Sequence, residues 1–88
     1  MKIANRNASE YTKSLTPFEG SNLSGVLTDK FYIVYSYGWY PVFVYDRINR
    51  VWIENKDKYS PTTSKQTTQA RPTEDTIKFN KHQIKAIL

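Results

Sequence analysis

The sequence predicts a small α+β domain: an antiparallel β-meander of four or five strands, a C-terminal helix and up to two further short helices. Three observations predict this class. β-Branched and aromatic residues are concentrated in residues 23–55, as is typical of strands. Turn-forming residues interrupt that region at hairpin spacing. A capping pair followed by apolar residues at helical spacing ends the chain.

The polar segment 1–20 precedes the meander and is expected to be flexible or to contain a short helix around Ser9 to Leu15, ended by Pro17. The first strand is expected over residues 23–28. Asp29 and Lys30 then form a turn into the strand at residues 31–37.

Two loops determine the predicted register of the meander. Gly38-Trp39 suits a two-residue type II′ turn, which pairs Tyr37 with Tyr40 at the start of the strand 40–46. A three-residue loop ending at Asn49 pairs Asp46 with Arg50, at the start of the strand 50–55.

This register makes both faces of the sheet apolar, unlike a sheet with one solvated side. Terminal segments therefore cover both faces, or one face is an aromatic contact surface. The first face carries Tyr32, Val34, Phe43, Tyr45, Val51 and Ile53; the second carries Phe31, Ile33, Tyr35, Tyr37, Tyr40, Val42, Val44, Trp52 and Glu54. The residues of the candidate aromatic contact surface are Tyr35, Tyr37, Trp39, Tyr40 and Trp52.

The segment 60–72 is rich in threonine and has no apolar stripe, so it predicts either a polar helix or an ordered loop. Residues 76–79 predict a last strand. Asn80 and Gln83 form a candidate capping pair for a helix that places Ile84 on its apolar side, where it can cover the sheet. The whole of 1–88 is expected to be a single domain.

Catalysis is not expected from this sequence. It has no cysteine, its one histidine is His82, and its three glycines are scattered rather than grouped in a phosphate-binding loop. Glu54 and Asp57 are too few to predict a metal site, and Glu74-Asp75 suits a solvated turn. We therefore predict no catalytic residue, metal or other cofactor.

A basic, hydroxyl-rich segment is the strongest candidate binding feature. The net charge is +5, and the excess lies mainly after residue 45. Lys, Arg, Thr and Gln side chains donate to phosphate oxygens, and aromatic rings on a sheet can stack on exposed bases. The candidate contact residues are Arg47, Arg50, Lys56, Lys58, Thr62, Thr63, Lys65, Gln66, Gln69 and Arg71.

Several segments resemble a family of small uncharacterised proteins from bacteriophages and related mobile elements, over roughly residues 20–88. They are Gly20–Leu23, Tyr35–Asp46, Trp52 with Asn55, Asp57–Gln66 and Gln69–Pro72. Relatives are expected to carry a histidine where Gln66 stands, so this chain departs from them at that position. The resemblance implies a bacteriophage context and carries over no function. Small phage accessory proteins without catalytic residues often act by occupying a surface on a host protein, such as a defence nuclease or polymerase, so we expect a phage-type accessory role here.

Two functions follow as hypotheses. The first is binding to nucleic acid or a host nucleoprotein through the basic segment, with steep salt dependence. The second is a protein–protein inhibitor or assembly factor anchored by the aromatic face. A homodimer that buries one sheet face is a variant of the second. The N-terminus lacks an apolar run behind its charges, so we expect no signal peptide, no membrane partner and a location in the cytoplasm, that of the host cell for a phage protein.

Overall fold

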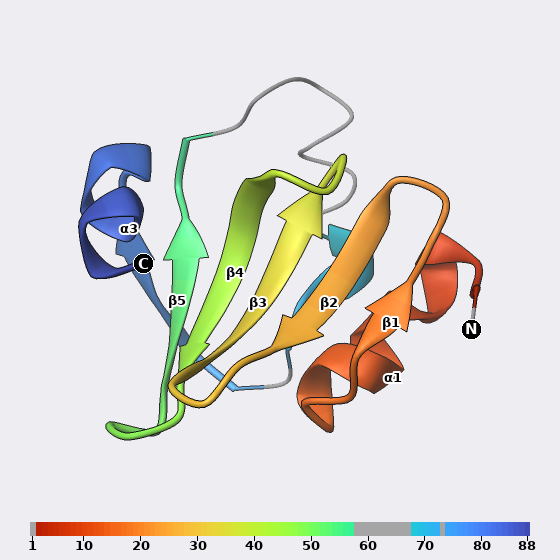
Figure 1. Ribbon diagram of the computed structural model, residues 1–88, viewed down its shortest axis with the longest axis horizontal. Helices are drawn as coiled ribbons and strands as arrows, with labels where there is room; N and C mark the ends of the chain where they lie inside the picture. The colour runs from red at the N-terminus through yellow and green to blue at the C-terminus, as the bar shows by residue number, and fades with distance from the viewer. Residues whose placement is uncertain (1, 58–67, 73) are drawn as a thin grey trace.

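The protein folds as a six-stranded sheet with short helices on its two faces, and the predicted α+β class is confirmed (Figure 1). The computed structural model describes residues 2–57, 68–72 and 74–88. The elements are η1 (Asn5–Asn7), α1 (Ala8–Lys13), β1 (Phe18–Glu19), β2 (Leu23–Leu27), β3 (Phe31–Ser36), β4 (Tyr40–Asp46), β5 (Val51–Asn55), β6 (Thr76–Phe79) and α3 (Lys81–Ile87). Residues 68–70 are also helical, whereas the rest of the segment expected at 60–72 lies largely outside the described residues.

Strand order follows chain order from β1 to β6. The pairs from β1 to β5 are antiparallel, as expected for a meander, and β6 lies parallel to β5. The prediction of four or five strands omitted β1, because two residues are too short for an alternating pattern. The parallel pairing was also missed, since it depends on a long connection after β5 whose path no local pattern specifies.

The predicted turn between β3 and β4 is wrong by one residue. Tyr37 and Gly38 both have positive φ, 56° and 79°, and the Trp39 N–H donates to the Ser36 carbonyl at 3.3 Å. Positive φ at both central residues is the pattern of a type I′ turn rather than type II′. The strands absorb the shift through an irregularity between Val34 and Tyr35, so the Ile33–Val44 pairing agrees with the prediction.

The loop between β4 and β5 is longer by one residue than predicted. The Asp46 carboxylate accepts the Ile48 and Asn49 N–H groups at 3.0 and 3.1 Å, and the left-handed position falls on Arg50, whose φ is 56°. Asp46 therefore pairs with Val51. A one-residue slip moves every side chain of the strand to the other face, so Trp52, Ile53 and Glu54 lie opposite to the predicted faces.

Each face of the sheet has its own apolar core. Ala8 of α1 and Ala70 pack with Tyr32, Phe43 and Trp52 on one face. On the other, Ile84 of α3 is fully buried in a cluster with Ile33, Val44 and Ile53. Coverage of the two faces by terminal segments is thus confirmed, but α3 extends mainly over β4 and β6 and leaves part of its face open (Figure 1).

The predicted capping pair of the C-terminal helix is confirmed. The Asn80 side chain accepts the Gln83 N–H at 2.8 Å, and the Gln83 side chain accepts the Asn80 N–H at 2.8 Å. Because these reciprocal bonds satisfy two N–H groups that the first helical turn leaves without intrahelical partners, they position α3 at the end of β6.

Candidate aromatic and basic groove

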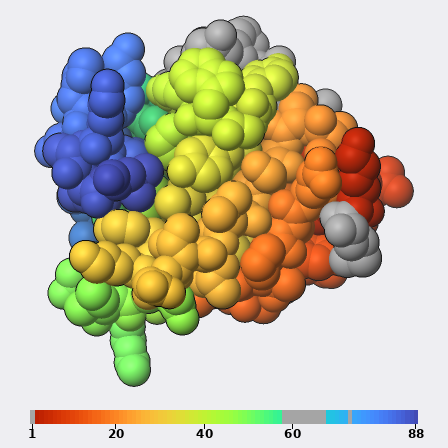
Figure 2. Space-filling model, viewed as in Figure 1, coloured from red at the N-terminus to blue at the C-terminus, as the bar shows by residue number. Residues whose placement is uncertain are grey.

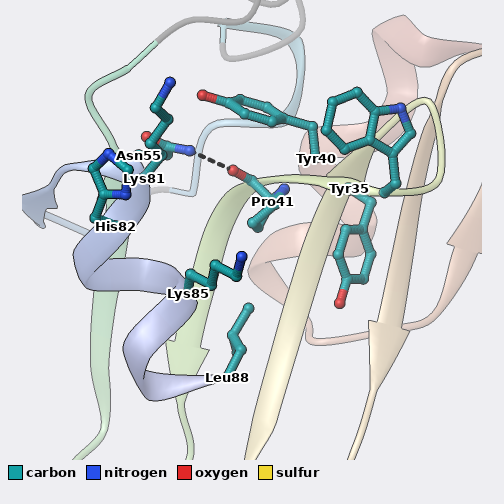
Figure 3. A pocket seen from close by; sticks show the side chains of 9 residues that line it. Tyr35, Tyr40, Pro41, Asn55, Lys81, His82, Lys85 and Leu88 are labelled. Carbon is teal, nitrogen blue, oxygen red and sulfur yellow. Dashed lines mark hydrogen bonds between the residues drawn. The ribbon is translucent and has the colours of Figure 1, made fainter.

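A groove of about 650 Å³ separates the β3–β4 turn from α3. In Figure 2 the surface is hollowed between the blue atoms of α3 and the yellow-green atoms of the β3–β4 turn. This volume is within the usual range for small-molecule pockets, which is roughly 300–1,000 Å³. Aromatic residues of the sheet form one wall, and basic residues of the helix form the other (Figure 3).

The sheet wall consists of Tyr35, Trp39, Tyr40 and Pro41. Trp39 is 56 % exposed, whereas Tyr40 is buried. The two rings meet edge to face, with centroids 5.5 Å apart and planes at 75°. Such a contact restricts the orientation of the exposed indole, so Trp39 offers a positioned apolar surface at the mouth of the groove.

The helix wall consists of Lys81, His82, Lys85 and Leu88. Lys81 and Lys85 are four residues apart, so they project from the same side of α3 about 6 Å apart along its axis. Figure 3 shows the Lys85 side chain extending from α3 toward β4, above Leu88. Neither ammonium group forms an ion pair within the described part of the chain. Both charges are therefore available to an anion in the groove.

A buried polar cluster fixes the floor of the groove. The Asn55 side chain, 1 % exposed, donates to the Pro41 carbonyl at 2.8 Å and accepts the Asp57 N–H at 2.9 Å. The Tyr40 hydroxyl donates to the Asp57 carbonyl at 2.6 Å. Burial raises the pKa of Tyr40 above its usual value of 10.0, so this donor stays protonated at neutral pH.

Asp57 also joins the floor to the helix. Its carboxylate accepts the main-chain N–H of Lys81 at 3.0 Å. Tyr40 and Asn55 thereby connect through Asp57 to the start of α3, so the two walls of the groove are held at a defined separation. The Asp57 charge partly offsets the basic wall at this end, and Lys85 stands one helical turn farther from it.

The predicted aromatic contact surface is divided between groove, rim and core. Tyr35 and Tyr40 line the groove with Trp39. Tyr37 is 47 % exposed on the turn beside them. Trp52 is 3 % exposed, so its assignment to a contact surface is wrong: the register slip turns it into the core. There it meets Tyr32 edge on, with ring centroids 6.2 Å apart.

The predicted basic residues that the structure describes are spread over several parts of the fold, and none of them lines the groove. Arg47 and Arg50 belong to the β4–β5 loop, at the opposite end of the sheet from α3 (Figure 1). The Arg47 guanidinium donates to the Thr28 carbonyl at 2.6 Å, while Lys56 is exposed just after β5. Gln69 is half-buried in the helical residues 68–70. The other predicted contacts, Lys58, Thr62, Thr63, Lys65 and Gln66, lie outside the described residues.

Arg71 has a structural partner. Its guanidinium makes two bonds to the Glu54 carboxylate, at 2.9 and 3.1 Å, and lies 5.7 Å from the centroid of the Phe43 ring. Glu54 is 3 % exposed and also accepts the Thr76 hydroxyl at 2.8 Å. The ion pair thus neutralises the buried Glu54 carboxylate, which the one-residue register slip of β5 moved to the face opposite to the predicted one.

Sequence reasoning missed Lys81, His82 and Lys85 as site residues. The sequence signal was present, because a helix with Ile84 facing the sheet places residues 81 and 85 beside that contact. These residues are about forty positions from the tyrosine-rich turn in the chain, so the sequence did not indicate that the helix and the turn would border one groove.

Comparison of the chain with protein-family models, with curated protein sequences and with solved structures found no match. Within residues 2–57, 68–72 and 74–88, no helix has the length and apolar character to cross a bilayer. The same residues contain no group of three or more His, Asp or Glu side chains placed to hold a metal ion.

Proposed function

We propose that this protein is a non-catalytic, phage-type accessory protein that binds nucleic acid, either free or in a host nucleoprotein, through the groove between the β3–β4 turn and α3. The observation that carries the proposal is the pairing of two chemistries in one groove: Trp39 and Tyr35 on the sheet wall, Lys81 and Lys85 on the helix wall. Aromatic surfaces and lysine ammonium groups are the two kinds of contact that nucleic acids accept from such proteins.

The phage context comes from the sequence resemblance alone. Small phage accessory proteins often act on a host component, and a defence nuclease is one such target. A protein that binds the nucleic acid of a nuclease complex, or competes with the nuclease for it, needs affinity for nucleic acid and no catalytic residue. The basic charge of the chain, +5, would draw it toward such a complex before any specific contact is made.

Salt dependence provides the first test. Fluorescent single- and double-stranded DNA and RNA would be titrated with the protein, with anisotropy as the signal. If the two groove lysines each neutralise one phosphate of a single strand, the slope of log K against log salt is about −1.4. Affinity then falls roughly sevenfold between about 50 and 200 mM salt.

Charge reversal identifies the surface responsible. The double variant Lys81→Glu, Lys85→Glu should abolish measurable binding at low salt. Lys30→Glu makes one such change in the exposed β2–β3 turn, away from the groove, and should retain nearly full affinity. Absence of binding to every nucleic acid at low salt, or equal affinities for the double variant and the native chain, would refute the proposal.

A protein partner is the second candidate. Trp39 and Leu88, 56 % and 46 % exposed, line the groove, and Tyr37 adds an exposed ring beside it. Exposed aromatic anchors often dominate protein interfaces. In that case nucleic acid would not bind, and Trp39→Ala would abolish retention of a host protein by the immobilised chain with little effect of salt.

A further inference from the structure

The geometry of the groove points to a single-stranded ligand: we infer that it holds one or two unpaired nucleotides, with a base against Trp39 and the backbone along Lys81 and Lys85. This inference rests on the proposed function and specifies the form of nucleic acid that the site accepts. Three features of the groove support it: the positioned indole, the placement of the lysines along one wall and the size of the space.

The indole is suited to stacking because it is both accessible and positioned. Trp39 is 56 % exposed and contacts the Tyr40 ring edge on. Tyr40 is in turn fixed by its hydroxyl bond to the Asp57 carbonyl. Stacking a base on a ring that is already restricted costs less side-chain entropy than stacking it on a mobile ring, which binding would have to order.

Both lysines are exposed to solvent and border the groove. Ile84 packs against the sheet and thereby positions α3. Lys81 and Lys85 precede and follow Ile84 in the helix, and both border the groove. Figure 3 shows Lys85 directed toward β4.

The size of the groove excludes a duplex from its interior. A space of about 650 Å³ matches a drug-sized ligand. In the interior of a duplex both faces of each base are stacked on neighbours, so the Trp39 ring could not stack on these bases. An unpaired base can leave its neighbours, and single-strand-binding proteins use aromatic platforms together with basic backbone tracks for this purpose.

The two tryptophans of the chain allow a direct optical test. Trp39 is 56 % exposed at the groove, whereas Trp52 is 3 % exposed in the core. Emission would be recorded while the protein is titrated with three probes of one length: a single-stranded oligonucleotide, its duplex, and an abasic strand with the same phosphates. The mononucleotide serves as a separate control. The Trp39→Phe variant retains Trp52 as an internal reference.

We expect the single strand to quench emission of the native chain and to leave Trp39→Phe unchanged. Trp39→Ala should weaken single-strand binding about 5- to 160-fold, the effect of losing one stacked base, and should leave abasic-strand binding unchanged. Ile48→Ala removes an apolar side chain, 70 % exposed, from the distant β4–β5 loop. It should change neither single-strand nor abasic-strand affinity. Lys85→Glu should weaken binding of both strands.

The outcomes separate this inference from the proposed function. Equal affinity for the single strand, duplex and abasic strand, with no effect of Trp39→Ala, would overturn the stacking site and leave nucleic-acid binding intact. If the mononucleotide bound as tightly as the oligonucleotide, the ligand would be a free nucleotide, and the inference that it is a nucleic-acid strand would be overturned. Failure of every probe to bind at low salt would overturn both proposals.

Discussion

Replacing Arg71 with alanine should destabilise the fold, because the guanidinium neutralises the buried carboxylate of Glu54. The Glu54 side chain is 4 % exposed and the Arg71 side chain is 47 % exposed, with N–O distances of 2.9 and 3.1 Å. Loss of one partner from a fully buried ion pair costs about 3–5 kcal/mol. Solvent around Arg71 lowers that cost, as do the Thr76 hydroxyl at 2.8 Å and the Lys78 ammonium at 3.9 Å, which Glu54 retains.

The expected loss is therefore about 2 kcal/mol for the charge, with about 0.5 kcal/mol more for the guanidinium above the Phe43 ring. Urea unfolding at neutral pH measures this loss of stability: with an m-value of about 1 kcal/mol/M, the midpoint falls by roughly 2.5 M. Arg71→Lys retains the charge without the two-bond geometry and should lose about half as much.

The double variant Glu54→Gln, Arg71→Ala should be less destabilised than the sum of its single variants, since the two residues act as a pair. Lys56→Ala removes an exposed cation close to the same strand and should shift stability by less than about 0.5 kcal/mol. If Arg71→Ala left the midpoint unchanged but weakened nucleic-acid binding, Arg71 would be a ligand contact, and its role as the structural partner of Glu54 would be refuted.

Three further predictions address packing, capping and pH. Gly25→Ala should lower stability by about 1–3 kcal/mol, because a Cβ there would lie 2.7 Å from the Phe18 ring; an unchanged urea midpoint would contradict it. Asn80→Ala removes the N-cap of α3 and should lose about 1 kcal/mol and loosen the helix wall of the groove, measured by unfolding and by oligonucleotide affinity; unchanged values for both would count against this role. The side-chain bond from Asn49 lowers the pKa of Asp46 below its usual 3.8, so its contribution to stability is present above that value and is lost as the pH falls through the lower folded-state pKa. Thermal unfolding between about pH 2 and 6 should show a shallower acid dependence for Asp46→Asn, and identical profiles would disprove the assignment.

The fold was predictable to the level of its elements because local signals specify them. The β-branched and aromatic runs indicated β2 to β5, and Asn80 with Gln83 indicated the start of α3. The faces were less predictable. They depend on which residue of each turn takes the left-handed conformation, and Tyr37 and Arg50 take it where glycine or asparagine was expected.

The site was predictable in part for the same reason. The tyrosine-rich turn was recognised as a candidate surface, and Tyr35, Trp39 and Tyr40 do line the groove. Trp52 was misassigned because a one-residue slip reverses the face of a whole strand. No sequence pattern indicated that α3 would bring its lysines to this turn, since that contact joins segments far apart in the chain.

The sequence by itself determined the α+β class, the central strands and the capped helix, because propensity, turn chemistry and capping act over a few residues. Tertiary structure decided which chemistry the surface presents. Packing of Ile84 into the second core places Lys81 and Lys85 opposite the aromatic turn, and packing of Trp52 into the first removes it from the surface. Both outcomes depend on the burial of apolar area between distant segments. The chain as a whole determines how much area is buried, and no local pattern contains that quantity.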